Sequence, residues 1–132
     1  QLHGFLSYLV RSVASGSPYT IFGYKGKQVR DNIHAYDVVN AFYHFYQDPR
    51  RGEVYNLGGG RESNVSVREA IKKAEDLTGK KAKVIYNDTA RIGDHIWYIS
   101  DMSKFRSHYP KWKLTRSMDS IFEEIAGFTD QA

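Results

Sequence analysis

Apolar residues recur at helical spacing in two long stretches of the chain. The first covers residues 5–13 and is followed by Gly16, a residue type that often ends a helix. The second is predicted to begin at Asp37, whose side chain suits an N-cap, and to run through Tyr46. One side of this second helix would carry Val38, Val39, Phe42, Phe45 and Tyr46.

Capping signals predict three more helices. Ser66 and Glu69 have the spacing of a capping box, so a helix is expected over 67–78, with Gly79 as its stop. Asp101 is expected to cap a short helix through about Arg106. An amphipathic helix after Ser117 would turn Ile121, Phe122 and Ile125 inward.

Short apolar runs between these helices predict strands. They lie at 19–22 and at 82–87, residues 96–100 are expected to be extended, and "VYNLGGG" (54–60) is expected to be a short buried strand with a glycine turn. Short strands mixed with about four to five helices predict an α/β fold. No linker divides the chain, so residues 1–132 are expected to form a single domain.

Composition excludes several classes of protein and site. Because the chain has no Cys, it has neither disulfides nor thiolate zinc sites. His3, His34, His44, His95 and His108 are scattered and predict no metal site. No apolar run is long enough to span a membrane, and a cytoplasmic setting is expected.

The net charge of +4 suggests an anionic partner. For most of the lysines, a solvated basic surface is the preferred interpretation. The basic residues are spread along the chain without a dense block, which argues against nucleic acid as the partner.

Two segments imitate cofactor or catalytic motifs. "EVYNLGGGRESNVSVREAI" reads strand, glycine loop, helix, the order of a dinucleotide site. The helix is expected to begin near Val67, well past Gly60, and Ser63 occupies the third glycine position, so a simple turn is preferred. Tyr109 and Lys113 have the spacing of a catalytic Tyr-x-x-x-Lys pair, but the proline between them argues against the helix that this pair needs.

Three segments together resemble a known family. They are "IFGYKGKQVRDNIHAYDVVNAF", "GEVYNLGGGRESNVSVREAI" and "ARIGDHIWYISDMSKFRSHYPKWKLTRSMDSIFEEI". Their order resembles the C-terminal part of Rossmann-type extended short-chain dehydrogenases/reductases, the NAD-dependent nucleotide-sugar epimerases and dehydratases. The wording of the second and third segments is most similar to the CDP-paratose/CDP-tyvelose 2-epimerase branch.

The resemblance implies that catalysis and substrate binding lie in different portions of the full-length enzyme. The family carries its glycine-rich NAD loop and its Tyr-x-x-x-Lys pair in the N-terminal portion, and this sequence contains neither. The chain is therefore expected to be a substrate-binding portion that is not catalytic alone, without catalytic, cofactor-binding or metal residues. NAD would belong to the full-length enzyme, which oxidises and reduces a sugar carbon transiently. Alternatives are a nucleotide-sugar dehydratase or 4-epimerase, or a stand-alone nucleotide-binding module.

The resemblance also implies the ligand and its contacts. The ligand would be a nucleoside diphosphate sugar carrying CDP or UDP. Arg30 and Arg91 match positions that contact the diphosphate, which suits the planar fork of arginine, and Asn32 matches a position near the phosphates.

Three further residues complete the expected site. Phe22, with Ile21, matches the segment that packs on the base, and Asp94 matches a carboxylate that accepts ribose hydroxyls. Each residue has a structural alternative: a surface ion pair of Arg30 with Asp31, a core position for Phe22, or a turn made by Asp94. Exposed strand edges and apolar helix faces are also expected to cause self-association.

Overall fold

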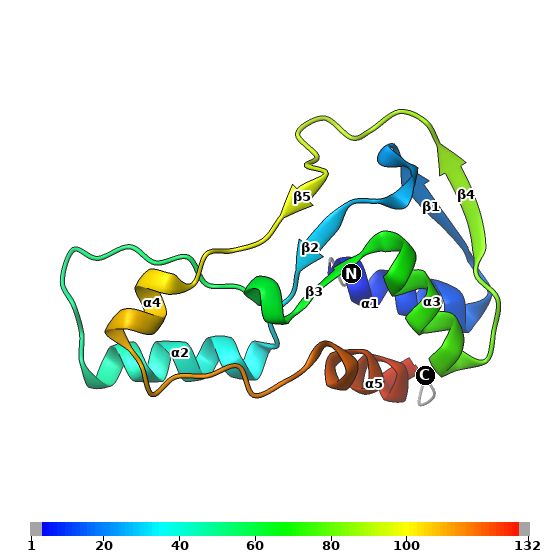
Figure 1. The fold of residues 1–132 in the computed structure, drawn as a ribbon. Coiled ribbons are helices and arrows are strands. Elements are labelled where there is room, and N and C mark those ends of the chain that lie inside the picture. The colour runs from blue at the N-terminus through cyan, green and yellow to red at the C-terminus, as the bar shows by residue number, and fades with distance from the viewer. Residues whose placement is uncertain (1–3, 130–132) are drawn as a thin grey trace.

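Two short sheets position the rest of the chain (Figure 1). The computed structural model describes residues 4–129. Strand β1 (Pro18–Phe22) pairs in parallel with β4 (Lys83–Asn87). In the second sheet β2 (Val29–Asp31) lies between β3 (Asn64–Ser66), which is antiparallel to it, and β5 (Trp97–Tyr98), which is parallel. The expected strands at 19–22 and 82–87 are thus confirmed.

Three helices pack against one another beside the first sheet and form the larger hydrophobic core. They are α1 (Phe5–Ser15), α3 (Val67–Thr78) and α5 (Met118–Thr129). Gly16 adopts φ 70° and ends α1, while Ser66 and Glu69 form the expected capping box of α3. Ile121 and Phe122 of α5 are buried as predicted.

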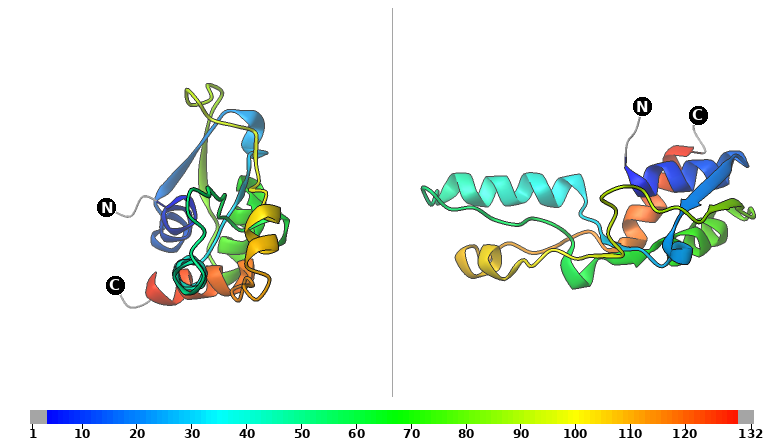
Figure 2. Two further views of the ribbon diagram at one scale, coloured as in Figure 1. Left: turned by 90° about the vertical axis from the view of Figure 1, so that its left-hand side faces the viewer. Right: turned by 90° about the horizontal axis from the view of Figure 1, so that it is seen from above.

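A second, smaller core lies at the other end of the molecule (Figures 1 and 2). Helices α2 (Ala35–Gln47) and α4 (Ser103–His108) lie there together, apart from α1 and α3. Trp112 is 2% exposed and donates from its indole nitrogen to the carbonyl of Asp37 at 3.1 Å. With the five helices among the described residues, the α/β prediction is confirmed.

The predicted N-cap at Asp37 is wrong. Helix α2 begins at Ala35, and His34 is its N-cap, with Nδ1 accepting the Tyr36 N–H at 3.0 Å. Asp37 is fully buried, and its carboxylate accepts hydrogen bonds from the Thr115 hydroxyl at 2.6 Å and from the Arg116 N–H at 3.1 Å. A partner far along the chain, and not the helix start, therefore explains this carboxylate.

The strand predicted at "VYNLGGG" is also wrong. Residues 53–58 form no strand, and the Val54 side chain is 80% exposed. A strand needs a neighbour to pair with its backbone groups, and no described segment pairs with this one. After it comes a single turn of 3₁₀ helix, η2 (Gly60–Glu62). A similar turn, η1 (Tyr24–Gly26), follows β1 earlier in the chain.

Capping at the later helices follows the prediction only in part, because the N-cap of α4 is Met102 and not Asp101. Asp101 accepts the Ser103 N–H at 2.9 Å at the start of α4, and the Ser117 hydroxyl accepts the Ser120 N–H at 3.1 Å before α5. Helix α4 ends at His108, so Tyr109 and Lys113 do not share a helix face. Tyr109 is 4% exposed and donates to the Asp48 carbonyl at 2.9 Å, which is a structural role.

Candidate functional site

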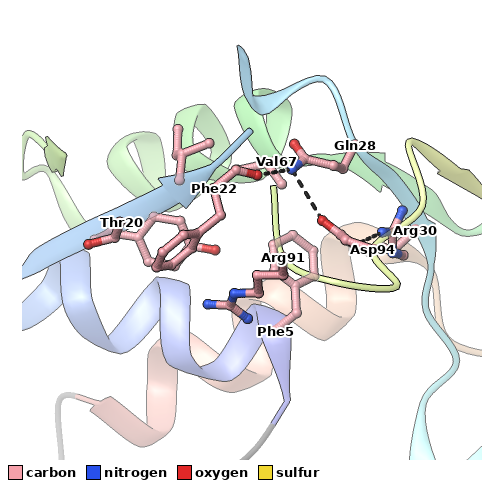
Figure 3. Close-up of a pocket in the computed structure, with 10 residues that line it drawn as sticks. Phe5, Thr20, Phe22, Gln28, Arg30, Val67, Arg91 and Asp94 are labelled. Atoms are coloured by element: carbon pink, nitrogen blue, oxygen red, sulfur yellow. Dashed lines mark hydrogen bonds and ion pairs between the residues drawn. The ribbon is translucent and has the colours of Figure 1, made fainter. Parts of the chain in front are cut away.

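A cavity of about 210 Å³ lies beside β1, under the start of α1 and the segment that joins β4 to β5 (Figure 3). Five of the six predicted site residues line it: Ile21, Phe22, Arg30, Arg91 and Asp94. Its other walls are Phe5, Tyr19, Thr20, Gln28 and Val67. Strand β1 supplies most of the apolar wall through Tyr19, Ile21 and Phe22.

Arg91 lies over the ring of Phe22, with 4.4 Å between the guanidinium carbon and the ring centroid. This cation–π contact holds the arginine at the cavity, as Figure 3 shows. The Arg91 side chain makes no hydrogen bond or ion pair within the part of the chain that the structure describes. Its planar donors therefore remain available to a ligand.

Unlike Arg91, Arg30 already has partners within the protein, because three oxygens accept hydrogen bonds from its guanidinium. It forms an ion pair with Asp94, donates to the His95 carbonyl, and donates to the Val29 carbonyl at 2.7 Å. The side chains of Arg30 and Asp94 are about a quarter exposed, at 26% and 24%. This arrangement ties β2 to the segment that carries Asp94.

The alternative of an ion pair between Arg30 and Asp31 is not what the structure has. Asp31 accepts the backbone N–H groups of Gly60 at 2.9 Å and Ser100 at 3.0 Å. Asp31 therefore connects β2 to the backbone at Gly60 and at Ser100. Of the two neighbours, Arg30 lines the cavity and Asp31 does not.

Gln28 is a cavity residue that the sequence analysis did not select. It is 6% exposed, and its amide nitrogen donates to the Phe22 carbonyl at 2.6 Å and to the second oxygen of Asp94 at 3.4 Å. Its amide oxygen is buried without a hydrogen-bond partner. The alternation of a strand could have indicated it, since Gln28 precedes Arg30 by two positions.

Asn32 is the one predicted residue that does not line the cavity. Its side-chain amide donates to the Arg30 carbonyl at 3.1 Å, and its backbone N–H donates to the Ser63 carbonyl at 2.8 Å. Here it supports the backbone that carries Arg30.

Comparisons with known proteins agree with this architecture. Residues 1–58 match the profile of the NAD-dependent epimerase/dehydratase family. A CDP-paratose 2-epimerase of Salmonella typhi is 32% identical over 89 residues, which make up 66% of this chain and 26% of that protein. The solved structure of MoeE5 in complex with UDP-glucuronic acid and NAD superposes with a TM-score of 0.85 at 30% identity, over 99% of this chain and 42% of that one.

The chain is similar to the NAD-dependent epimerase/dehydratase family, whose model matches its residues 1–58. A second relative, a UDP-arabinose 4-epimerase of Arabidopsis thaliana, is 37% identical over 83 residues, 61% of this chain and 19% of that protein. The two named relatives differ in both nucleotide and sugar. The chain spans about a quarter or less of each of these relatives.

The family name refers to NAD, and the glycine turn at 58–60 is the segment to test for its phosphates. A Cβ on Gly58 would lie 2.3 Å from Ser100 Oγ and 2.4 Å from the Asp31 carboxylate. A Cβ on Gly59 would lie 2.1 Å from the Asn32 carbonyl oxygen. These glycines therefore make room for the protein's own atoms, and α3 begins well beyond them, so NAD phosphates do not fit here.

Other kinds of site find no support in residues 4–129. That range holds no cluster of three or more His, Asp or Glu that could bind a metal ion, and His3 lies outside the described residues. His34 pairs instead with Glu124 at 3.0 Å, and His108 with the Tyr55 hydroxyl at 2.7 Å. None of the helices in the same range has the length and apolar character needed to cross a bilayer.

Proposed function

We propose that this chain is the nucleotide-sugar-binding portion of a longer NAD-dependent nucleoside diphosphate sugar epimerase. The observation that carries the proposal is the cavity beside β1, which gathers an aromatic ring, two arginines and a carboxylate from three separate segments. Flat rings, arginine forks and carboxylates suit the base, the diphosphate and the ribose of a nucleotide, respectively.

Each group would contact a different part of the ligand. Phe22, backed by Ile21, offers the surface on which a base packs. Arg91 would bind the diphosphate, because its donors have no acceptor among the described residues. Arg30 would add positive charge from the other side, and Asp94 would meet the ribose hydroxyls. Asn32 would not contact the ligand and would instead position the backbone of Arg30 through a hydrogen bond to its carbonyl.

The catalytic groups and the NAD site are proposed to lie in the rest of the enzyme. The chain covers 42% of the MoeE5 chain, whose structure contains both UDP-glucuronic acid and NAD. Residues 1–132 would then act as one substrate-binding unit that orients the sugar for chemistry performed elsewhere. We favour a CDP-sugar 2-epimerase over a 4-epimerase or a dehydratase, because the wording of the second and third segments resembles that branch and a CDP-paratose 2-epimerase is among the similar proteins.

Calorimetric titration of the chain with CDP, UDP and NAD tests the proposal. We expect CDP or UDP to bind and NAD to show no tight binding. Arg91→Ala is expected to weaken the nucleotide about tenfold or more, because a hydrogen bond to a charged group is worth about 1.5–3 kcal/mol. Arg51→Ala is the matched control, since Arg51 is exposed in a turn far from the cavity.

The result has a clear reading in either direction. A loss confined to Arg91→Ala supports the cavity as the nucleotide site, and the tighter of the two bases supports one branch of the family. Equal losses in Arg91→Ala and Arg51→Ala would mean that the nucleotide only follows the net charge. A folded chain to which no nucleotide binds would overturn the proposal.

A further inference from the structure

The hydroxyl of Tyr19 is a polar group at the cavity that the rest of the fold does not use. Tyr19 lies on β1, lines the cavity and is 8% exposed. Within residues 4–129 its hydroxyl makes no hydrogen bond. Its oxygen is not among the buried polar atoms that lack a partner in that range, which are Gln28 Oε1 and Ser63 Oγ, so it is accessible to a partner outside the protein.

The tyrosines of the second core show the usual behaviour. Tyr109 is buried, and its hydroxyl donates to the Asp48 carbonyl at 2.9 Å. The Tyr55 hydroxyl lies 2.7 Å from His108 Nδ1. The fold can thus supply partners for tyrosine hydroxyls, whereas the Tyr19 hydroxyl is accessible beside a cavity and has no partner among the described residues.

The ring of Tyr19 is held in place by its neighbours. Its centroid lies 5.8 Å from that of Tyr8, with the two ring planes at 43°. Burial raises the pKa of the Tyr19 hydroxyl above its ordinary value of 10.0, and the nearby charge of Arg91 lowers it in part. The hydroxyl therefore stays protonated and is a hydrogen-bond donor next to the guanidinium of Arg91.

Two unused donors beside one cavity select for a particular kind of ligand atom. The Tyr19 hydroxyl and the Arg91 guanidinium both need acceptors. Phosphate oxygens are acceptors that carry negative charge, which also suits Arg91. The alternative acceptor nearby is the Asp94 carboxylate, but Arg30 and Gln28 already donate to it.

We propose that the Tyr19 hydroxyl binds the diphosphate of the nucleotide together with Arg91, as a second donor that positions the phosphates. This inference rests on the proposed nucleotide-binding function. It assigns to Tyr19 a contact that neither the family resemblance nor the apolar pattern of β1 suggested.

Tyr19→Phe tests the contact, because it removes the hydroxyl and keeps the ring that packs on Tyr8. We expect the dissociation constant for CDP to rise about tenfold, the loss of one hydrogen bond to a charged group. Binding of cytidine, followed by chemical-shift titration, should not change, since cytidine has no phosphate. Tyr8→Phe is the control: Tyr8 is 55% exposed and does not line the cavity, and the affinity for CDP should stay the same.

A second readout separates this role from a structural one. Without ligand, Tyr19→Phe should unfold at the same urea concentration as the unchanged chain or a higher one, because the hydroxyl has no partner to lose. Destabilisation without ligand would overturn the inference. So would equal losses for CDP and cytidine, or unchanged CDP binding by Tyr19→Phe. If the unchanged chain binds no nucleotide, the proposed function is contradicted as well. If Tyr19→Phe binds CDP as the unchanged chain does, only the role of Tyr19 is contradicted.

Discussion

Asp37 shows how much one buried carboxylate can hold together. It lies in the first turn of α2 and is fully buried. Its oxygens accept from Thr115 and Arg116, which precede α5, while its own carbonyl accepts from the Trp112 indole. This residue therefore connects the smaller core to the segment that leads back to the larger one.

Replacing Asp37 by Ala is expected to destabilise the chain by about 2–4 kcal/mol, because two backbone N–H groups and a hydroxyl would lose their acceptor in a buried place. Urea unfolding followed by circular dichroism measures the change. Asp76→Ala is the control, since Asp76 makes an exposed i,i+4 pair with Lys72 at 3.0 Å. That pair is worth about 0.5 kcal/mol or less. Similar losses in both variants would contradict the role given to Asp37.

Gly59 offers a second prediction for a single residue. Because a Cβ there would lie 2.1 Å from the Asn32 carbonyl oxygen, Gly59→Ala must push backbone apart. We expect a loss of about 2–3 kcal/mol in the free energy of unfolding, the upper range for overpacking. Gly127→Ala should instead be neutral or stabilise α5 by up to about 1 kcal/mol, as nothing lies within 4 Å of its added Cβ. Thermal unfolding of the two variants gives opposite shifts if the contact is correct.

For single residues, the sequence could group the candidate site residues, and their roles toward a ligand stay predictions. Phe22, Arg30, Arg91 and Asp94 do meet at one cavity. Tyr19 was missed because an aromatic residue in an apolar strand predicts core packing, and only the fold reveals that its hydroxyl has no partner. The partners of Asp37 lie 78 and 79 positions away, a distance that no local capping rule reaches.

Among the elements, α3 is the one whose ends are best defined by sequence. Ser66 Oγ accepts the Glu69 N–H at 3.2 Å, and the Glu69 carboxylate accepts the Ser66 N–H at 2.8 Å. Gly79 closes the helix at φ 65°. These hydrogen bonds from Ser66 hold the pKa of Glu69 below its ordinary value of 4.5.

This lowered pKa predicts a pH dependence with a definite sign. Between its pKa in the folded chain and 4.5, Glu69 binds fewer protons in the folded chain than in the unfolded one. The stabilisation is therefore complete above pH 4.5 and is lost as the pH falls through the lower, folded pKa. Unfolding curves at several pH values should show a smaller acid-induced loss for Glu69→Gln than for the unchanged chain. Glu123→Gln, at an exposed position of α5, serves as the control.

Other elements needed information that lies outside their own residues. The pattern of "VYNLGGG" is that of a strand, yet pairing is a property of two segments, and the described residues supply no second one. Strands β2 and β3 join in an antiparallel pair only because the chain returns from α2 beside them. Local spacing could predict α1, α3, α4 and α5, because the backbone hydrogen bonds of a helix form within its own segment and need no second one.

Over the whole molecule, the exposed apolar side of α2 is the main departure from an ordinary surface. Val39 is 65% exposed, Phe42 64% and Tyr46 76%, all on the side of the helix that was predicted to carry apolar residues. Strand β4 adds an edge that pairs with β1 alone among the described residues. Such surfaces favour association.

We therefore expect the isolated chain to associate with itself, as was also predicted from the sequence. Sedimentation velocity over a range of concentrations should show species larger than the monomer. The double variant Phe42→Lys with Tyr46→Lys should shift the distribution toward monomer, while Ile92→Lys, at a fully exposed position of another segment, should not. A chain that stays monomeric at all concentrations would contradict this expectation.

The segment from 88 to 96 begins where β4 ends and leads into β5, so it joins the two-stranded sheet to the three-stranded one. Tyr24, just after β1, donates to the Asp94 carbonyl at 3.3 Å, and Arg30 on β2 pairs with the Asp94 carboxylate. A ligand that contacts both Phe22 and Arg91 would close a ring of contacts that passes through both sheets. Departure of the ligand and separation of the sheets would then be one event, and deuterium exchange at the amides of β4 and β5 would report the residence time of the nucleotide.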